Sequence, residues 1–63
     1  MKFTRGSSKM DKVITYASED GFYKISKRPS ENAWVVREYS LFNILGDEIA
    51  RCSSLEEAIA LFN

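Results

Sequence analysis

The sequence predicts one α+β domain: a small antiparallel β-meander of three to four strands with a C-terminal helix packed on one face. Between residues 12 and 52, short segments rich in β-branched and aromatic residues alternate with turn signals, which is typical of strands joined by tight reversals. The chain then changes period, because Leu55, Ala58, Ile59 and Phe62 follow the spacing of an amphipathic helix. A helix this short is not stable alone, so its apolar stripe must pack on the sheet.

The chain has 63 residues, of which 44% are hydrophobic, enough for one folded domain with a thin core. Residues 1–11 contain Gly6-Ser7-Ser8 and show little periodicity, so we expect a flexible arm or a short frayed strand around Phe3. We place the folded domain at residues 12–63. No apolar run has the length of a membrane span, and the first residues lack the apolar core of a signal peptide. We therefore expect a soluble, cytoplasmic protein without membrane contact.

The first two predicted strands are joined by a strong turn signal. Residues 12–17 are rich in β-branched and aromatic side chains. Asp20-Gly21 predicts a hairpin turn, because glycine accepts the positive φ that tight reversals require. Residues 22–28 alternate in character and form the returning strand.

The second half of the sheet is less sharply defined. A proline within residues 29–32 predicts the second reversal, because proline cannot donate to a strand ladder. Residues 34–39 resume the strand pattern. Residues 40–46 fit either an extended strand with a bulge or a loop lying over the sheet. We expect Gly46-Asp47 to turn the chain into a fourth strand at residues 48–52.

The helix start is predicted by a capping box. Ser54 is placed to accept a hydrogen bond from a free backbone N–H at the first turn, and Glu57, three residues later, is placed to reach back to the Ser54 amide. Glu56 and Glu57 also lie near the positive end of the helix dipole. Adjacent helix positions point about 100° apart, so these two carboxylates indicate a cap rather than an acid/base pair.

Strand alternation assigns the side chains to two faces of the sheet. We expect the helix to cover Tyr23, Ile25, Trp34 and Val36. The opposite face mixes aromatic rings with cations, residue types that are enriched in protein interfaces. The candidate partner-binding residues are Phe22, Lys24, Arg28, Arg37, Tyr39 and Phe42. An alternative interpretation is that the rings only cover a thin core on both sides of the sheet.

Nine basic and nine acidic side chains give no formal net charge, but the two signs are unevenly distributed. Residues 1–30 carry seven basic and three acidic side chains, and residues 31–63 carry two basic and six acidic ones. A mixed, solvated surface accounts for this pattern. Alternatively, the basic half binds an acidic partner such as a phosphate backbone, or the acidic half binds a basic partner.

Catalytic, metal-binding and cofactor-binding signatures are missing from the sequence. There is no histidine, the residue most often used as a general base or zinc ligand. Cys52 has no imidazole to activate it and is expected to be a small buried hydrophobe. Asp47 and Glu48 provide too few oxygen ligands for a calcium loop, and Gly6-Ser7-Ser8-Lys9 lacks the second glycine of a phosphate-binding loop. We therefore expect a protein that is not an enzyme and uses no cofactor or metal.

The favoured hypothesis is a small binding module that regulates or inhibits another protein through the exposed aromatic and arginine face. An accessory regulator or inhibitor, such as one encoded by a mobile element, is a role that fits so small a chain. An exposed apolar face can also be covered by self-association, which would make a homodimer.

The alternative hypothesis is nucleic-acid binding. The predicted order of antiparallel strands and a terminal helix over residues 12–62, with Trp34-Val35-Val36, Gly46 and Ser54-Leu55-Glu56-Glu57-Ala58, resembles the small DNA-binding domains at the N-termini of tyrosine recombinases and in plant AP2 factors. The resemblance implies that a sheet face enters the major groove of DNA. The chain departs from such domains because it lacks the cationic excess that phosphate contacts require. In this hypothesis the phosphate contacts and base-stacking rings are Lys24, Lys27, Arg28, Arg37, Phe22 and Tyr39.

Overall fold

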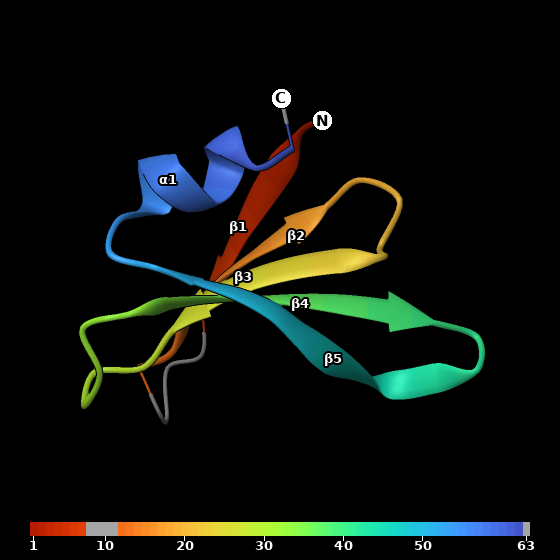
Figure 1. Ribbon diagram of the computed structural model, residues 1–63, viewed down its shortest axis with the longest axis horizontal. Coiled ribbons are helices and arrows are strands. Elements are labelled where there is room, and N and C mark those ends of the chain that lie inside the picture. Colours follow the sequence, from red (N-terminus) through yellow and green to blue (C-terminus); the bar gives the residue numbers. More distant parts are fainter. Residues whose placement is uncertain (8–11, 63) are drawn as a thin grey trace.

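The computed structural model of the protein describes residues 1–7 and 12–62. The described chain forms one antiparallel sheet of five strands, ordered as in the sequence, with one short helix after the last strand (Figure 1). The elements are β1 (Phe3–Ser7), β2 (Ile14–Ser18), β3 (Tyr23–Lys27), β4 (Trp34–Ser40), β5 (Asn43–Cys52) and α1 (Leu55–Ala60). The predicted α+β meander with a C-terminal helix is confirmed, but the sheet has five strands rather than three to four.

The additional strand is β1, within the segment expected to be an arm or a frayed strand. It pairs with β2 along its whole length, from Phe3 opposite Ser18 to Ser7 opposite Ile14. Arg5, Gly6 and Ser7 are not strand-forming residue types, so the sequence signal for this strand is weak. Pairing with β2 supplies the hydrogen bonds that hold it. Residues 8–11 of the expected arm lie outside the described residues.

The last reversal lies earlier than the sequence predicts. Ser40 pairs with Asn43, so the chain turns at Leu41-Phe42. The expected turn at Gly46-Asp47 is wrong: both residues lie inside β5, where Gly46 has a φ of 80°. A positive φ serves a bulge as well as a turn, and the β4–β5 register shifts between Glu38 and Ser40, opposite this glycine.

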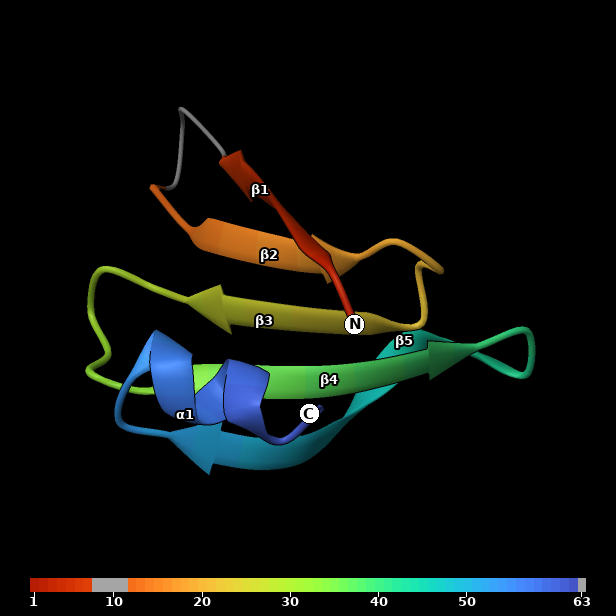
Figure 2. The same ribbon diagram turned by 90° about the horizontal axis from the view of Figure 1, so that it is seen from above.

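The core lies between the sheet and α1, which crosses β4 and β5 on one face (Figure 2). Ile25, Val36 and Ala58 are completely buried. The predicted apolar stripe is confirmed, because Leu55, Ile59 and Phe62 pack against these buried residues together with Ala58. Partly buried side chains that complete this core are Phe3, Tyr16, Trp34, Ala50 and Cys52.

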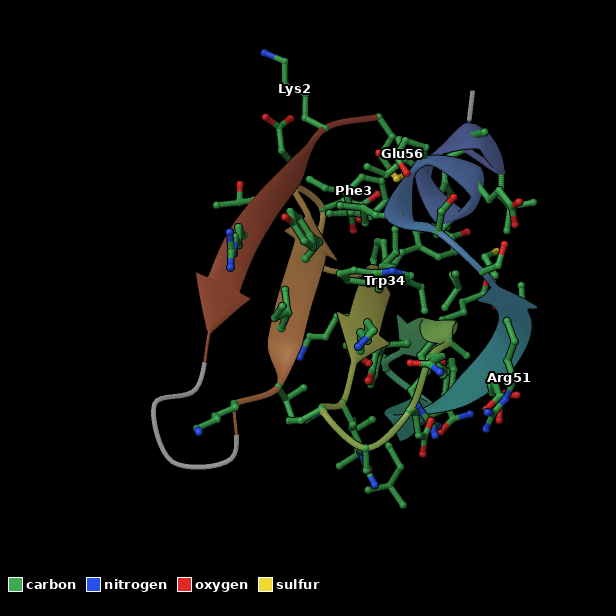
Figure 3. All side chains as sticks on the ribbon, turned by 90° about the vertical axis from the view of Figure 1, so that its left-hand side faces the viewer. Lys2, Phe3, Trp34, Arg51 and Glu56 are labelled. Atoms are coloured by element: carbon green, nitrogen blue, oxygen red, sulfur yellow. The ribbon has the colours of Figure 1, made fainter. Side chains whose placement is uncertain are left out.

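The two ends of the described chain meet on the helix side of the sheet. The ring of Phe62 lies 5.2 Å from the ring of Phe3 and 4.9 Å from that of Tyr23, measured between centroids. Phe3 and Trp34 both lie on the side of the sheet that faces α1 (Figure 3). Tilted ring contacts at these distances are favourable. Phe62 therefore connects the end of the helix to β1 and β3.

The helix cap follows the predicted design with one change of partner. Ser54 accepts a hydrogen bond from the Glu57 N–H at 3.2 Å. The Glu57 carboxylate, however, accepts from the backbone N–H and the hydroxyl of Ser53, at 3.3 and 3.1 Å, instead of from the Ser54 amide. The backbone of Ser54 is extended, with φ −140° and ψ 158°. This conformation brings the backbone N–H of Ser53 within hydrogen-bond distance of the Glu57 carboxylate.

Candidate functional site

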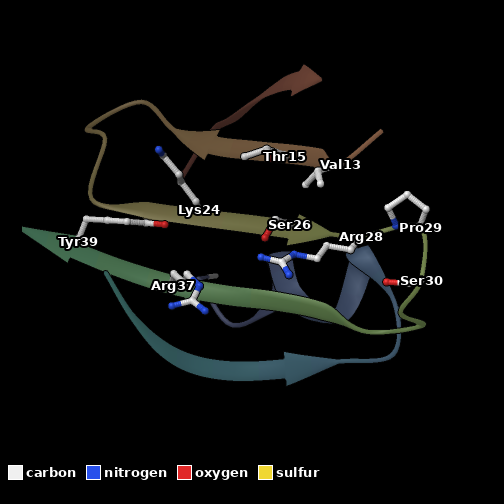
Figure 4. A pocket seen from close by; sticks show the side chains of 9 residues that line it. All are labelled: Val13, Thr15, Lys24, Ser26, Arg28, Pro29, Ser30, Arg37 and Tyr39. Carbon is white, nitrogen blue, oxygen red and sulfur yellow. The ribbon is translucent and has the colours of Figure 1, made fainter. Parts of the chain in front are cut away.

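Among residues 1–7 and 12–62, no second layer of structure covers the face of the sheet opposite α1, and we call it the open face. A groove of about 690 Å³ runs over it across β2, β3 and β4 (Figure 4). Its walls combine three cations, one aromatic ring, three hydroxyl groups and two small apolar side chains. The residues that line the groove are Val13, Thr15, Lys24, Ser26, Arg28, Pro29, Ser30, Arg37 and Tyr39.

Four of the six predicted partner-binding residues come together in this groove: Lys24, Arg28, Arg37 and Tyr39. Phe22 lies just outside it, in the loop before β3, and is 49% exposed. Its carbonyl accepts a hydrogen bond from the Tyr39 N–H at 2.7 Å, so it borders the Tyr39 end of the open face. Phe42 does not belong to the groove, because it lies at the apex of the β4–β5 turn.

Two of the cations lie directly opposite each other on neighbouring strands. Lys24 on β3 is the register partner of Arg37 on β4, a placement in which like charges destabilise a sheet. The Lys24 ammonium lies 5.0 Å from the centroid of the Tyr39 ring, within cation–π range. Arg37 donates from Nη1 to the Gly46 carbonyl at 3.4 Å. Within residues 1–7 and 12–62, neither cation forms a salt bridge with a carboxylate.

The third cation is carried by the β3–β4 turn. The Glu31 N–H donates to the Arg28 carbonyl at 3.1 Å, which closes a tight turn around Pro29-Ser30. Proline at the second position of such a turn presets its backbone φ. The Arg28 side chain extends back over the open face toward Ser26 and Arg37 (Figure 4). The turn therefore brings a third positive charge to the groove.

Two carboxylates beside the groove, Glu31 and Glu48, are engaged by another arginine. Arg51 forms a two-bond contact with Glu48, from Nε at 2.9 Å and from Nη2 at 3.1 Å, and lies 3.8 Å from Glu31. The hydrogen bonds from Arg51 hold the pKa of Glu48 below its ordinary value, and Glu48 in turn raises the pKa of Arg51. Glu48 is also the register partner of Arg37, whose charge lowers the pKa of Glu48 further, but the hydrogen bonds to its oxygens come from Arg51. This ion-pair cluster borders the groove along its β5 side.

Sequence reasoning missed part of the groove wall. Thr15 contributes from β2, and its position between Ile14 and Tyr16, which belong to the opposite face, could have been read from strand alternation. Val13, Pro29 and Ser30 lie outside the strands. Their contribution depends on the path of two loops, for which the sequence contains no periodic signal.

Other kinds of site have little support in the described residues. Within residues 1–7 and 12–62, no three histidine, cysteine, aspartate or glutamate side chains gather closely enough to hold a metal ion. Cys52 is a free, half-buried thiol that packs against the core. In the same part of the chain, no helix has the length and apolar character needed to cross a membrane.

Comparison of the chain with protein-family models, with curated proteins and with solved structures found no match.

Proposed function

We propose that the chain is a non-catalytic binding module that regulates or inhibits another protein by binding an acidic segment of that protein in the groove of the open face. One observation carries the proposal: Lys24 and Arg37 lie side by side on neighbouring strands, and no carboxylate of the described residues bridges them. A directly opposed pair of like charges costs up to about 1 kcal/mol. A carboxylate placed between the two cations would turn that repulsion into two attractions.

The groove also offers the chemistry that fixes such a segment in place. Arg28 and Arg37 can each bind a carboxylate through two parallel N–H donors. Thr15, Ser26 and Ser30 add hydroxyl groups that bind main-chain carbonyls or N–H groups. Tyr39 lines the same groove as a rigid side chain with a further hydroxyl group. The partner is therefore an extended acidic peptide segment.

DNA binding through the same face is the second candidate, because three cations and a ring on one sheet face are also the components of a nucleic-acid surface. The surroundings of the ring favour the first candidate. The Lys24 ammonium lies over the Tyr39 ring, and the ring also packs against Gly46. A nucleic-acid base could therefore stack on the ring only after Lys24 or the Gly46 backbone moves.

The two candidates are separated by fluorescence anisotropy with two labelled probes of equal charge, an oligo-glutamate peptide and a short DNA duplex. We expect the peptide to bind more tightly than the duplex at physiological salt. Arg28→Gln and Arg37→Gln should each weaken peptide binding roughly tenfold, because each removes charge-assisted hydrogen bonds. Lys27→Gln is the matched control: it removes the same charge next to Arg28, on the helix side of the sheet.

Each outcome decides between the candidates. Equal losses in Lys27→Gln and Arg28→Gln would assign the binding to overall charge and would contradict a groove site. If the duplex binds more tightly than the peptide and its affinity falls steeply with added salt, the partner is DNA and not a protein. Affinity capture from the native host with and without nuclease then identifies the partner, and capture should fail with Arg28→Gln and succeed with Lys27→Gln.

A further inference from the structure

The outer half of the β4–β5 hairpin exposes four large apolar side chains that contact no core. We call Leu41, Phe42, Ile44 and Leu45 the apolar tip; these residues are 89%, 101%, 80% and 84% exposed. The hairpin extends away from α1 and from the remainder of the sheet (Figure 2). The groove does not include any of the four. The fold itself therefore gives no reason for apolar residues at this place.

The residue types in the β4–β5 turn also indicate that Leu41 and Phe42 do not serve the stability of the fold. Two-residue hairpin turns favour glycine, asparagine or aspartate, because their central residues adopt positive φ. Leu41 and Phe42 occupy this turn with negative φ, since among the described non-glycine residues only Lys12 has a positive value. Natural proteins break such local rules mainly where function requires it. Two bulky apolar residues at the apex thus indicate a contact surface.

The exposed area is large for a chain of this size. A phenylalanine side chain offers about 200 Å² and leucine or isoleucine somewhat less, so the apolar tip presents on the order of 600 Å² to solvent. Ile44 and Leu45 are consecutive residues of β5 and point to opposite faces, so this area surrounds the end of the hairpin. In size it matches the largest apolar patches of ordinary monomers, about 300–600 Å². Counted over two copies, the apolar tips amount to about 1,200 Å², the lower limit of the total surface buried in specific protein interfaces.

We propose that a second copy of this chain covers the apolar tip, so that the protein forms a symmetric dimer through its β4–β5 hairpins. β5 is an edge strand of the sheet, and its outer backbone groups are free to pair with an added strand. A two-fold axis brings β5 of one copy antiparallel to β5 of the other and places the apolar tips together. The formal net charge of zero removes the long-range repulsion between copies.

The inner half of β5 limits how far this pairing extends. Gly46 interrupts the strand with a bulge, and Asp47 and Glu48 follow it. Bulges and charges are the features by which natural edge strands avoid pairing. The contact is therefore confined to Asn43–Leu45 and the turn. It leaves the groove open, so dimerisation is independent of the binding function proposed above.

Sedimentation equilibrium of the purified full chain over a wide concentration range tests the dimer. We expect the mass to rise from one to two chains, with little weakening when salt is added, because the contact is apolar. Phe42→Ser should raise the dimer dissociation constant at least tenfold. Leu61→Ser is the matched control, since Leu61 is a 57% exposed apolar residue at the end of α1, away from the hairpin. Circular dichroism confirms that both variants fold.

The alternatives give different results. A monomer at all concentrations, or a dimer unaffected by Phe42→Ser, would overturn the proposal. Growth into open-ended assemblies would indicate edge pairing of β5 with β1 of the next copy. Cosedimentation of the monomer with neutral phosphatidylcholine vesicles, lost in Phe42→Ser, would assign the apolar tip to a lipid surface. Oligo-glutamate binding by a monomeric protein would reject the dimer and leave the groove function intact.

Discussion

The ring of Tyr39 lies directly against the backbone of Gly46: a β carbon at position 46 would come within 2.7 Å of the ring's Cζ atom. Two further groups hold the same glycine. The Arg37 guanidinium donates a hydrogen bond to the Gly46 carbonyl at 3.4 Å, and the Gly46 N–H donates one to the Asn43 side-chain oxygen at 3.1 Å. The bulge in β5 and the Tyr39–Arg37 side of the groove are therefore one structural unit.

Gly46→Ala should destabilise the fold by more than Gly21→Ala. Both glycines have a φ near 80°, so both substitutions incur the cost of a left-handed backbone, about 1–2 kcal/mol. Only at position 46 does the added carbon also collide with a ring, whereas at position 21 it meets open space. Overpacking typically adds 1–3 kcal/mol. Urea unfolding of the two variants measures the difference, and equal losses would show that Tyr39 simply moves away.

Removing the helix cap should also lower stability. Ser54→Ala leaves the Glu57 N–H without its acceptor, a change that usually costs about 1 kcal/mol. The expected result in urea unfolding is a lower midpoint with an unchanged slope. Glu57→Gln tests the second contact, because an amide oxygen can still accept from Ser53 while the charge near the helix start is lost. A larger loss from Glu57→Gln than from Ser54→Ala would contradict the cap geometry.

The parts of this fold that were predictable are those with a local cause. The capping serine, the Asp20-Gly21 turn and the 3-4-3 stripe of α1 each depend on neighbours in the sequence. The Lys24, Arg28, Arg37 and Tyr39 group followed from strand alternation. For β1 the sequence left a flexible arm and a short frayed strand as alternatives, because its residues gain their hydrogen bonds from β2, which a local pattern does not reveal. Gly46 was misassigned because a bulge and a turn require the same backbone conformation, and only the pairing partner distinguishes them.

Stability toward acid should depend on Asp20. Its carboxylate accepts from the Ser18 hydroxyl at 2.6 Å and from the Phe22 N–H at 3.0 Å, and these hydrogen bonds lower the pKa of Asp20 below its ordinary value of 3.8. A folded-state pKa below the unfolded one adds stability that is present above the unfolded pKa and is lost as the pH falls through the folded pKa. The free energies of unfolding of the parent and Asp20→Asn should therefore differ at neutral pH.

That difference should shrink as the pH falls below about 4, the unfolded pKa of an aspartate. Glu19→Gln serves as the control, because it removes the same charge from the adjacent exposed residue. Urea unfolding from neutral to acid pH provides the measurement. A difference between the parent and Asp20→Asn that stays constant over this range would show that the hydrogen bonds of Asp20 persist after protonation.

Phe62→Ala should loosen the helix from the sheet. It removes the ring contacts to Phe3 and Tyr23 and part of the packing on the buried residues. Phenylalanine truncation in a full core costs about 3–5 kcal/mol, and a half-buried position should give somewhat less. Amide hydrogen exchange should then accelerate in α1 and β1 before it does in β3 and β4. Uniform acceleration over the whole sheet would indicate a single cooperative unit without a weaker end.

The contact between Phe3 and Phe62 also determines the position on the protein at which any polypeptide or label joined to its two ends is attached. Polypeptide joined before Phe3 or after Phe62 departs from the same corner, beside α1 (Figure 1). A short peptide could therefore join the two ends and new ends could be opened in a loop, as in a circular permutant. Labels for surface immobilisation placed at either end would present the opposite side of the sheet to solution, unobstructed.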